Sequence, residues 1–134
     1  MRCLIVDDSP GFVDAARGLL ESQGVTVVGV ASSGSEALRC FEELRPDVTL
    51  VDVDLGSDSG FEVAEQPQRV GGPAPSPVIL ISTHAAQDFA DMIAASSAVG
   101  FLAKSALSRL AIRELLSDWD GGHPTDPVSA SREE

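Results

Sequence analysis

Aromatic residues, cationic residues, cysteine and long apolar runs are all scarce in this sequence. Its 134 residues include no tyrosine, one tryptophan and two cysteines, and nine lysines and arginines stand against 21 aspartates and glutamates. The net charge of −12 disfavours direct nucleic-acid binding, because a phosphate backbone would be repelled. No apolar stretch predicts a membrane span, and no signal peptide is recognisable at the start. The expected protein is soluble and cytoplasmic, with Cys3 and Cys40 reduced.

Short runs of Val, Ile and Leu alternate with amphipathic helical patterns, which predicts repeated β–α units around a parallel sheet. The expected strands are Cys3–Val6, Val25–Ala31, Val48–Val51, Val78–Ile81 and Val99–Ala103. The predicted fold class is therefore α/β: a flavodoxin-like, doubly wound, five-stranded parallel sheet with helices on both faces. Residues 1–118 are expected to form this domain, and 119–134 a flexible C-terminal tail or linker.

Start and stop signals mark the first two helices. Ser9 and Pro10 predict an N-cap followed by proline at the first helical position, and Gly24 predicts the end of this helix. Ser33 and Glu36 predict the capping box of a second helix. Its expected end is Pro46, and the residues expected to face the core from the two helices are Phe12, Ala16, Leu19, Leu20, Ala37, Phe41 and Leu44.

The later helices are marked less clearly. A third is expected from near Ser59 to Pro67, where proline ends it early. A fourth is expected over 85–97 with Phe89, Met92 and Ile93 inward, and a fifth over 106–116.

Polar residues follow the predicted strands where each one ends. Asp7 and Asp8 follow the first strand, Asp52 the third, Ser82 the fourth and Lys104 the fifth. In a parallel sheet these ends share one edge, so the side chains are expected to converge. Three carboxylates that close would raise one another's pKa, and a hard divalent cation such as Mg²⁺ would relieve the repulsion. The set predicts a metal and a phosphoryl group bound together, with Lys104 as the mobile positive charge.

Each residue has an ordinary interpretation when it is taken alone. Asp8 could cap a helix, Asp52 could be a turn residue, and Lys104 could lie on the surface. Thr83 could cap the next helix, and His84 is interpreted as a solvated loop residue without a ligand role. The joint placement at the correct strand ends favours the functional interpretation.

The sequence resembles the receiver domain of two-component response regulators over roughly residues 2 to 117. The segments that carry the resemblance are Leu4–Asp8, Pro46–Leu55 with Ser59-Gly60, Val78–Ser82 and Gly100–Lys104. An aspartate followed eight residues later by glycine, together with the acidic pair and the lysine, is a specific pattern. The resemblance implies a domain that accepts a phosphoryl group rather than an enzyme with an external substrate.

By this resemblance Asp52 is the phosphoacceptor. It implies a Mg²⁺ or Mn²⁺ ion bound directly by Asp8, mostly through water by Asp7, and by Asp52 and the backbone carbonyl of Asp54. Lys104 matches the lysine that contacts the phosphate.

The resemblance also implies a switch and partners. Ser82 matches the hydroxyl that closes onto the phosphoryl group, and Phe101 the aromatic residue whose rotamer follows activation. The responding face would comprise the fourth helix, fifth strand and fifth helix, and it could also support a homodimer. The implied partners are a sensor histidine kinase or phosphotransfer protein, and an effector protein or an output domain omitted from this sequence.

Four positions depart from the family pattern. Gly56 stands where proline is common, Thr83 is larger than the usual alanine, and Pro67 shortens the third helix. Ser105 replaces a proline that usually follows a cis bond, and a cis bond before serine costs about 2.5–4 kcal/mol. None of these changes removes a reacting group.

Three other classes of protein compete with this interpretation. Asp52-Val53-Asp54 has the Asp-x-Asp form of haloacid-dehalogenase-like phosphatases, but that family carries it on the first strand, and Asp7 and Asp8 would then be unexplained. An interaction module of receiver fold that does not use phosphate would commonly lack one of the acidic residues or the lysine. A nucleotide-binding domain is the weakest alternative, since no glycine-rich dinucleotide turn or P-loop is present.

Overall fold

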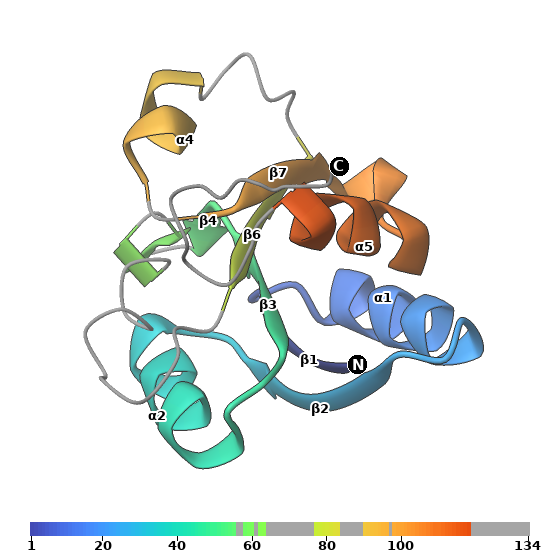
Figure 1. The fold of residues 1–134 in the computed structure, drawn as a ribbon. Coiled ribbons are helices and arrows are strands. Elements are labelled where there is room, and N and C mark those ends of the chain that lie inside the picture. Colours follow the sequence, from blue (N-terminus) through green and yellow to red (C-terminus); the bar gives the residue numbers. More distant parts are fainter. Residues whose placement is uncertain (56–57, 61, 64–76, 84–89, 97, 119–134) are drawn as a thin grey trace.

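Five parallel strands form one sheet in the part of the chain that the structure describes. The computed structural model describes residues 1–55, 58–60, 62–63, 77–83, 90–96 and 98–118. The strands of the sheet are β1 (Arg2–Val6), β2 (Thr26–Ala31), β3 (Val48–Asp52), β6 (Val78–Ser82) and β7 (Gly100–Ala103). Their order is β2-β1-β3-β6-β7, so the sheet winds outward in both directions from β1 and β3, as Figure 1 shows. The predicted doubly wound sheet is confirmed.

Helices cover both faces of this sheet (Figure 1). The helices are α1 (Pro10–Ser22), α2 (Gly34–Leu44), α4 (Ala90–Ala95) and α5 (Arg109–Asp118), with a 3₁₀ turn, η2 (Lys104–Ala106), before α5. Helices α1 and α5 lie together on one face, and α2 lies on the other. No helix among the described residues is long and apolar enough to cross a membrane.

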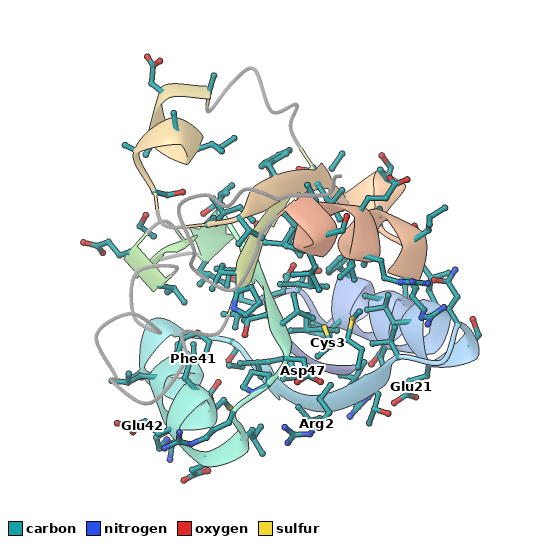
Figure 2. The ribbon with its side chains drawn as sticks, viewed as in Figure 1. Arg2, Cys3, Glu21, Phe41, Glu42 and Asp47 are labelled. Carbon is teal, nitrogen blue, oxygen red and sulfur yellow. The ribbon has the colours of Figure 1, made fainter. Side chains whose placement is uncertain are left out.

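The sheet separates two hydrophobic cores, because side chains alternate between the faces along each strand. Cys3 marks the core beneath α1 and α5, and Phe41 of α2 marks the other; both are labelled in Figure 2. The central strands β3 and β6 are buried along their whole length, which explains their continuous apolar sequences. Each fully buried Leu or Ile contributes about 1.5–3 kcal/mol of transfer free energy. This rigid frame holds the ends of the strands in place.

Both cysteines are free thiols in this frame. Cys3 is fully buried in the core, and burial raises the pKa of its thiol to about 12. Cys40 is half-buried on α2. Neither forms a disulfide.

Two predictions of inward-facing residues were wrong. Leu19 of α1 is 39% exposed and Met92 of α4 is 52% exposed. A helical stripe of apolar residues is wider than the contact that one sheet face can cover, so a residue at its margin stays in water. Ile93, next to Met92, does pack against the core on the α2 face.

The helix ends follow the predicted signals with two changes of detail. Ser9 occupies the N-cap of α1 and Pro10 its first turn, but the Ser9 side chain makes no capping hydrogen bond. The Ser33 hydroxyl accepts a hydrogen bond from the Glu36 N–H as expected. The Glu36 carboxylate, however, binds the backbone and hydroxyl of Ser32 instead of closing a reciprocal box on Ser33.

The last helix begins later than predicted, at Arg109 rather than near Ala106. Ala106 instead ends the 3₁₀ turn η2, and Leu107 and Ser108 separate that turn from α5. Several other predictions lie outside the described residues: Gly56, the helix end at Pro67, the loop residue His84, the inward Phe89, and the tail over 119–134.

A short antiparallel hairpin, which the sequence did not indicate, follows β3. It consists of β4 (Asp54–Leu55) and β5 (Asp58–Ser59), and Gly60 comes directly after it. The Gly60 N–H donates to the Val53 carbonyl at 3.1 Å. A Cβ at Gly60 would lie 2.6 Å from Val53 Cα and would overlap the Asp52 carbonyl oxygen. Only glycine therefore allows the backbone to return this close to Asp52.

Gly60 and Gly18 are expected to respond in opposite ways to the same substitution. Gly60→Ala should lower the free energy of unfolding by about 1–3 kcal/mol, because the added methyl meets rigid backbone. Gly18→Ala should raise it by about 0.5–1 kcal/mol, since Gly18 lies within α1 with nothing within 4 Å of its added Cβ. Urea denaturation of the two variants measures both values, and equal effects would contradict the close approach at Gly60.

Candidate functional site

Two buried aspartates meet where β1 and β3 end. The strands run side by side in parallel, and Val6 of β1 is paired with Val51 of β3. The residues that follow this pair are Asp7 and Asp52, so the carboxylates emerge next to each other. Asp7 is 2% exposed and Asp52 is 7% exposed. The predicted convergence of the strand ends is confirmed for these two residues.

Asp8 completes a cluster of three carboxylates. One carboxylate oxygen from each of Asp7, Asp8 and Asp52 lies within 4.8 Å of the others. Asp8 is exposed, whereas its two neighbours are buried. The cluster is therefore open to solvent on the Asp8 side. The two buried carboxylates, those of Asp7 and Asp52, lie deeper in the protein.

Lys104 supplies the positive charge between the two buried carboxylates. Its Nζ lies 2.7 Å from Asp7 Oδ2 and 3.3 Å from Asp52 Oδ2. Apart from this ion pair, Asp7 Oδ2 has no hydrogen-bond partner among the described residues. The Lys104 side chain is itself only 13% exposed, so the attraction is weakly screened by water. The sequence placed Lys104 at this edge, and the structure shows that Asp7 holds it more closely than Asp52 does.

The pKa values of Asp52 and Lys104 are both shifted at this site, where one cation is shared between two carboxylates. Burial raises the pKa of Asp52, and the Asp7 charge raises it further, although the hydrogen bond from Asp54 and the nearby Lys104 act in the opposite direction. Burial acts to lower the pKa of Lys104, but its contacts with Asp7 and Asp52 outweigh that effect and raise the pKa. The ammonium therefore stays charged while the site keeps an excess of negative charge.

Backbone N–H groups fix the orientation of both buried carboxylates. The Ser9 N–H donates to Asp7 Oδ1 at 2.8 Å, as the chain turns from β1 into α1. The Asp54 N–H donates to Asp52 Oδ1 at 3.1 Å, which places the start of the β4–β5 hairpin beside the site. Each carboxylate thus has one oxygen held by the backbone and one directed to Lys104.

The remaining predicted site residues lie on the neighbouring strands. Ser82 ends β6, is 2% exposed, and is paired with Ala103, the residue before Lys104. Phe101 lies in β7, paired with Leu80, and packs partly buried against the core on the α2 face. Thr83 is exposed, and the bond before Ser105 is trans. Phe101 thus lies on the strand that leads into Lys104, and the register places Ser82 beside the end of that strand.

The chemistry of the cluster fits a hard divalent cation. Mg²⁺ and Mn²⁺ prefer oxygen ligands, and three carboxylates at one solvent-accessible edge offer a donor set of this type. A cavity of about 240 Å³ borders Asp7 and Asp8 between the start of α1 and the end of β2, with Asp14 and Val30 among its lining residues. This open side leaves room for the water ligands that Mg²⁺ usually retains.

One neighbour of Lys104 was not anticipated from the sequence. The Lys104 Nζ lies 4.3 Å from the centre of the Phe12 ring. Phe12 was assigned to the inner face of α1, and it does pack against the core there. The sequence indicates that Phe12 lies near the acidic pair, because it is in the first turn of the helix that follows Asp7 and Asp8. Its contact with Lys104 is visible only in the tertiary structure.

Comparison with known proteins agrees with this geometry. The sequence model of the response regulator receiver domain matches residues 3–116. A protein-glutamate methylesterase/protein-glutamine glutaminase of Hahella chejuensis is 38% identical over 82 residues, which are 61% of this chain and 23% of that protein. The transcriptional regulatory protein YvfU of Bacillus subtilis is 32% identical over 105 residues, which are 78% of this chain and 52% of that protein. This chain thus spans a quarter to a half of the length of these relatives.

A solved structure extends the comparison to three dimensions. The response regulator domain of Thermotoga maritima CheB superposes with a TM-score of 0.69 and 30% identity. The superposition covers 88% of this chain and 92% of that domain.

Neutralising Asp52 is expected to stabilise the metal-free protein in a pH-dependent way. The pKa of folded Asp52 is raised, whereas an unfolded aspartate has a pKa of about 3.9. The folded state therefore binds more protons just above that pH, and stability falls as the pH rises through this window. Asp52→Asn should accordingly raise the free energy of unfolding at pH 7, and the gain should shrink as the pH falls toward about 4.

The measurement is chemical denaturation in a chelating buffer at several pH values. The exposed Asp14→Asn serves as the control and should change stability by less than about 0.5 kcal/mol at every pH. A pH-independent effect of Asp52→Asn would count against the raised pKa.

Proposed function

Because this chain belongs to the response regulator receiver domain family, we propose that its Asp52 accepts a phosphoryl group from the phosphohistidine of a sensor histidine kinase or a phosphotransfer protein. The observation that carries the proposal is the cluster itself: Asp52 lies with Asp7 and Asp8 at one edge of the sheet, and Lys104 Nζ is 3.3 Å away. Such a site can neutralise the charge of an incoming phosphoryl group.

Asp52 would act as the nucleophile. One of its carboxylate oxygens forms a bond to phosphorus while the bond from phosphorus to the imidazole nitrogen breaks, and the electron pair stays on that nitrogen. The product is an acyl phosphate on Asp52. The Asp54 N–H keeps the carboxylate oriented during attack, and Lys104 offsets the charge on the phosphoryl oxygens. Phosphoryl transfer depends mainly on such placement and charge compensation.

The proposed cofactor is Mg²⁺ or Mn²⁺. Asp8, Asp7 and Asp52 would hold the ion, with the backbone carbonyl of Asp54 as a further ligand. When bound, it supplies charge neutralisation for the transferred phosphoryl group. The exposed Asp8 lets the ion enter from solvent without a change in the buried part of the cluster.

The proposed response to phosphorylation is a change in the face formed by α4, β7 and α5. An acyl phosphate adds about −1.5 to −2 charge and three acceptor oxygens. The Ser82 hydroxyl would bind one of these oxygens and draw the β6 end toward the site, which leaves space for Phe101 to turn inward. The pairing of Ser82 with Ala103 supports this route, because it joins the two strand ends that must move.

The altered face would be recognised by an effector protein or by an output domain that follows residues 1–118, and a second copy of the chain could bind there. We propose a cytoplasmic protein whose own chemistry is limited to its phosphorylation and dephosphorylation. The relatives named above carry methylesterase or transcriptional-regulator names over lengths that this chain does not span.

Asp52 is expected to become phosphorylated by a small donor. Incubation with acetyl phosphate and Mg²⁺ should add one phosphoryl mass to the intact protein, and Asp52→Ala should abolish the gain. Asp54→Asn should keep it, since only the backbone of Asp54 is proposed to act. No added mass on the wild type would instead favour an interaction module that does not use phosphate. Steady hydrolysis of an external phosphomonoester that requires Asp54 would favour a haloacid-dehalogenase-like phosphatase.

Divalent metal is expected to stabilise the folded protein through the carboxylate cluster. At 100 times its dissociation constant, Mg²⁺ should raise the free energy of unfolding of the wild type by about 2.7 kcal/mol. Asp8→Asn should remove most of this increase, while Asp14→Asn should retain it. Both residues are exposed and border the same cavity, so the pair is matched in charge and location. Denaturation with and without MgCl₂ at constant ionic strength measures the difference; loss in both variants would place the ion elsewhere.

A further inference from the structure

The ammonium group of Lys104 has an aromatic neighbour as well as two carboxylates. Its Nζ lies 4.3 Å from the centre of the Phe12 ring, which is within the range of a cation–π interaction. Phe12 lies in the first turn of α1 and packs half-buried against the core on that face. The ring is thus held by the core while one of its faces meets the ammonium.

This contact is strong for its class because the cation is withdrawn from water. The attraction between an ammonium and a ring grows as the pair is desolvated, and the Lys104 side chain is only 13% exposed. Lys104 also comes from η2, a turn of three residues between β7 and α5. Its long side chain would otherwise have many rotamers available. Phe12 therefore restricts where the ammonium can lie.

The three partners of Lys104 differ in what they do when a metal ion arrives. Asp7 and Asp52 belong to the cluster that fits a divalent cation, so the ion would compete with Lys104 for their oxygens. The Phe12 ring offers nothing to a hard cation, which prefers oxygen ligands. The ring is the partner that Lys104 would keep.

We propose that Phe12 is a positioning residue, whose ring holds the Lys104 ammonium beside Asp52 when the carboxylates are engaged by metal and phosphoryl group. The inference rests on the proposed phosphotransfer to Asp52. Phe12 acts through Lys104 alone, by the contact between its ring and the ammonium. Without the ring, the ammonium spends less time where the incoming phosphoryl oxygens need it.

A role of Phe12 in core packing alone makes different predictions. Packing depends on the size and shape of the ring, whereas a cation–π contact depends on the negative charge on its face. Stepwise fluorination of the ring removes that charge with little change in size. The sequence contains five phenylalanines, so the fluorinated residue must be introduced at position 12 alone, by nonsense suppression.

The first measurement is the rate of Asp52 phosphorylation by acetyl phosphate at saturating Mg²⁺. The rate should fall with each added fluorine, to a total decrease of about five-fold for a fully fluorinated ring. The same series at Phe41, which packs in the core on the other face of the sheet, should leave the rate unchanged. A flat series at position 12, or an equal decrease at Phe41, would overturn the proposal.

The second measurement does not depend on phosphorylation. Unfolding free energies in excess Mg²⁺ are compared for the Phe12 series in the wild type and in Lys104→Met, which keeps an unbranched side chain one atom shorter and without the charge. Fluorination should lower the free energy of unfolding only in the protein that contains Lys104. An equal change in unfolding free energy per added fluorine in both proteins would contradict the contact. If unfluorinated protein fails to accept phosphate while this coupling persists, the proposed function is wrong and the contact between ring and ammonium stands.

Discussion

Two buried carboxylates share one ammonium, and the rest of the site depends on this excess of negative over positive charge. Asp7 and Asp52 lie almost without solvent at adjacent strand ends, and Lys104 contacts both of them. Burial makes their mutual repulsion and their attraction to Lys104 stronger than they would be in water. Burial and the neighbouring Asp7 charge together raise the pKa of Asp52 although Lys104 lies beside it. A site in this condition favours the binding of further positive charge.

The fold offsets the cost of burying two like charges side by side with stabilising contacts outside the carboxylate cluster. The continuous apolar strands β3 and β6, covered on both faces, keep the strand ends rigid. Backbone N–H groups of Ser9 and Asp54 hold one oxygen of each carboxylate, and Gly60 lets the chain after the hairpin return against Asp52. Because the strand ends are rigid, a new charge at the site changes the electrostatic interactions among its side chains without unfolding the sheet.

The position of Lys104 connects the site with the face that could transmit a signal. Lys104 follows β7 directly and begins the turn into α5, and the Ser82 strand end is paired with the residue before it. Lys104 is therefore bonded directly to the end of β7, and Ser82 is linked to the same strand end by sheet pairing. Relatives of different total length match parts of this chain, over 23% of one protein and 52% of another.

The sequence by itself determined the five strands of the parallel sheet, the edge at which those strands end, and the residue types that meet there. These follow from local rules: apolar runs mark buried strands, Ser33 and Pro46 bound a helix, and parallel strands bring Asp7, Asp52 and Lys104 to one edge. The tertiary structure decided what depends on distances between elements. The exposure of Leu19, the later start of α5, the closer pairing of Lys104 with Asp7 and its contact with Phe12 all arise from how elements pack. Periodicity cannot resolve these features, because it gives the direction of a side chain along its own element but not which neighbour it meets.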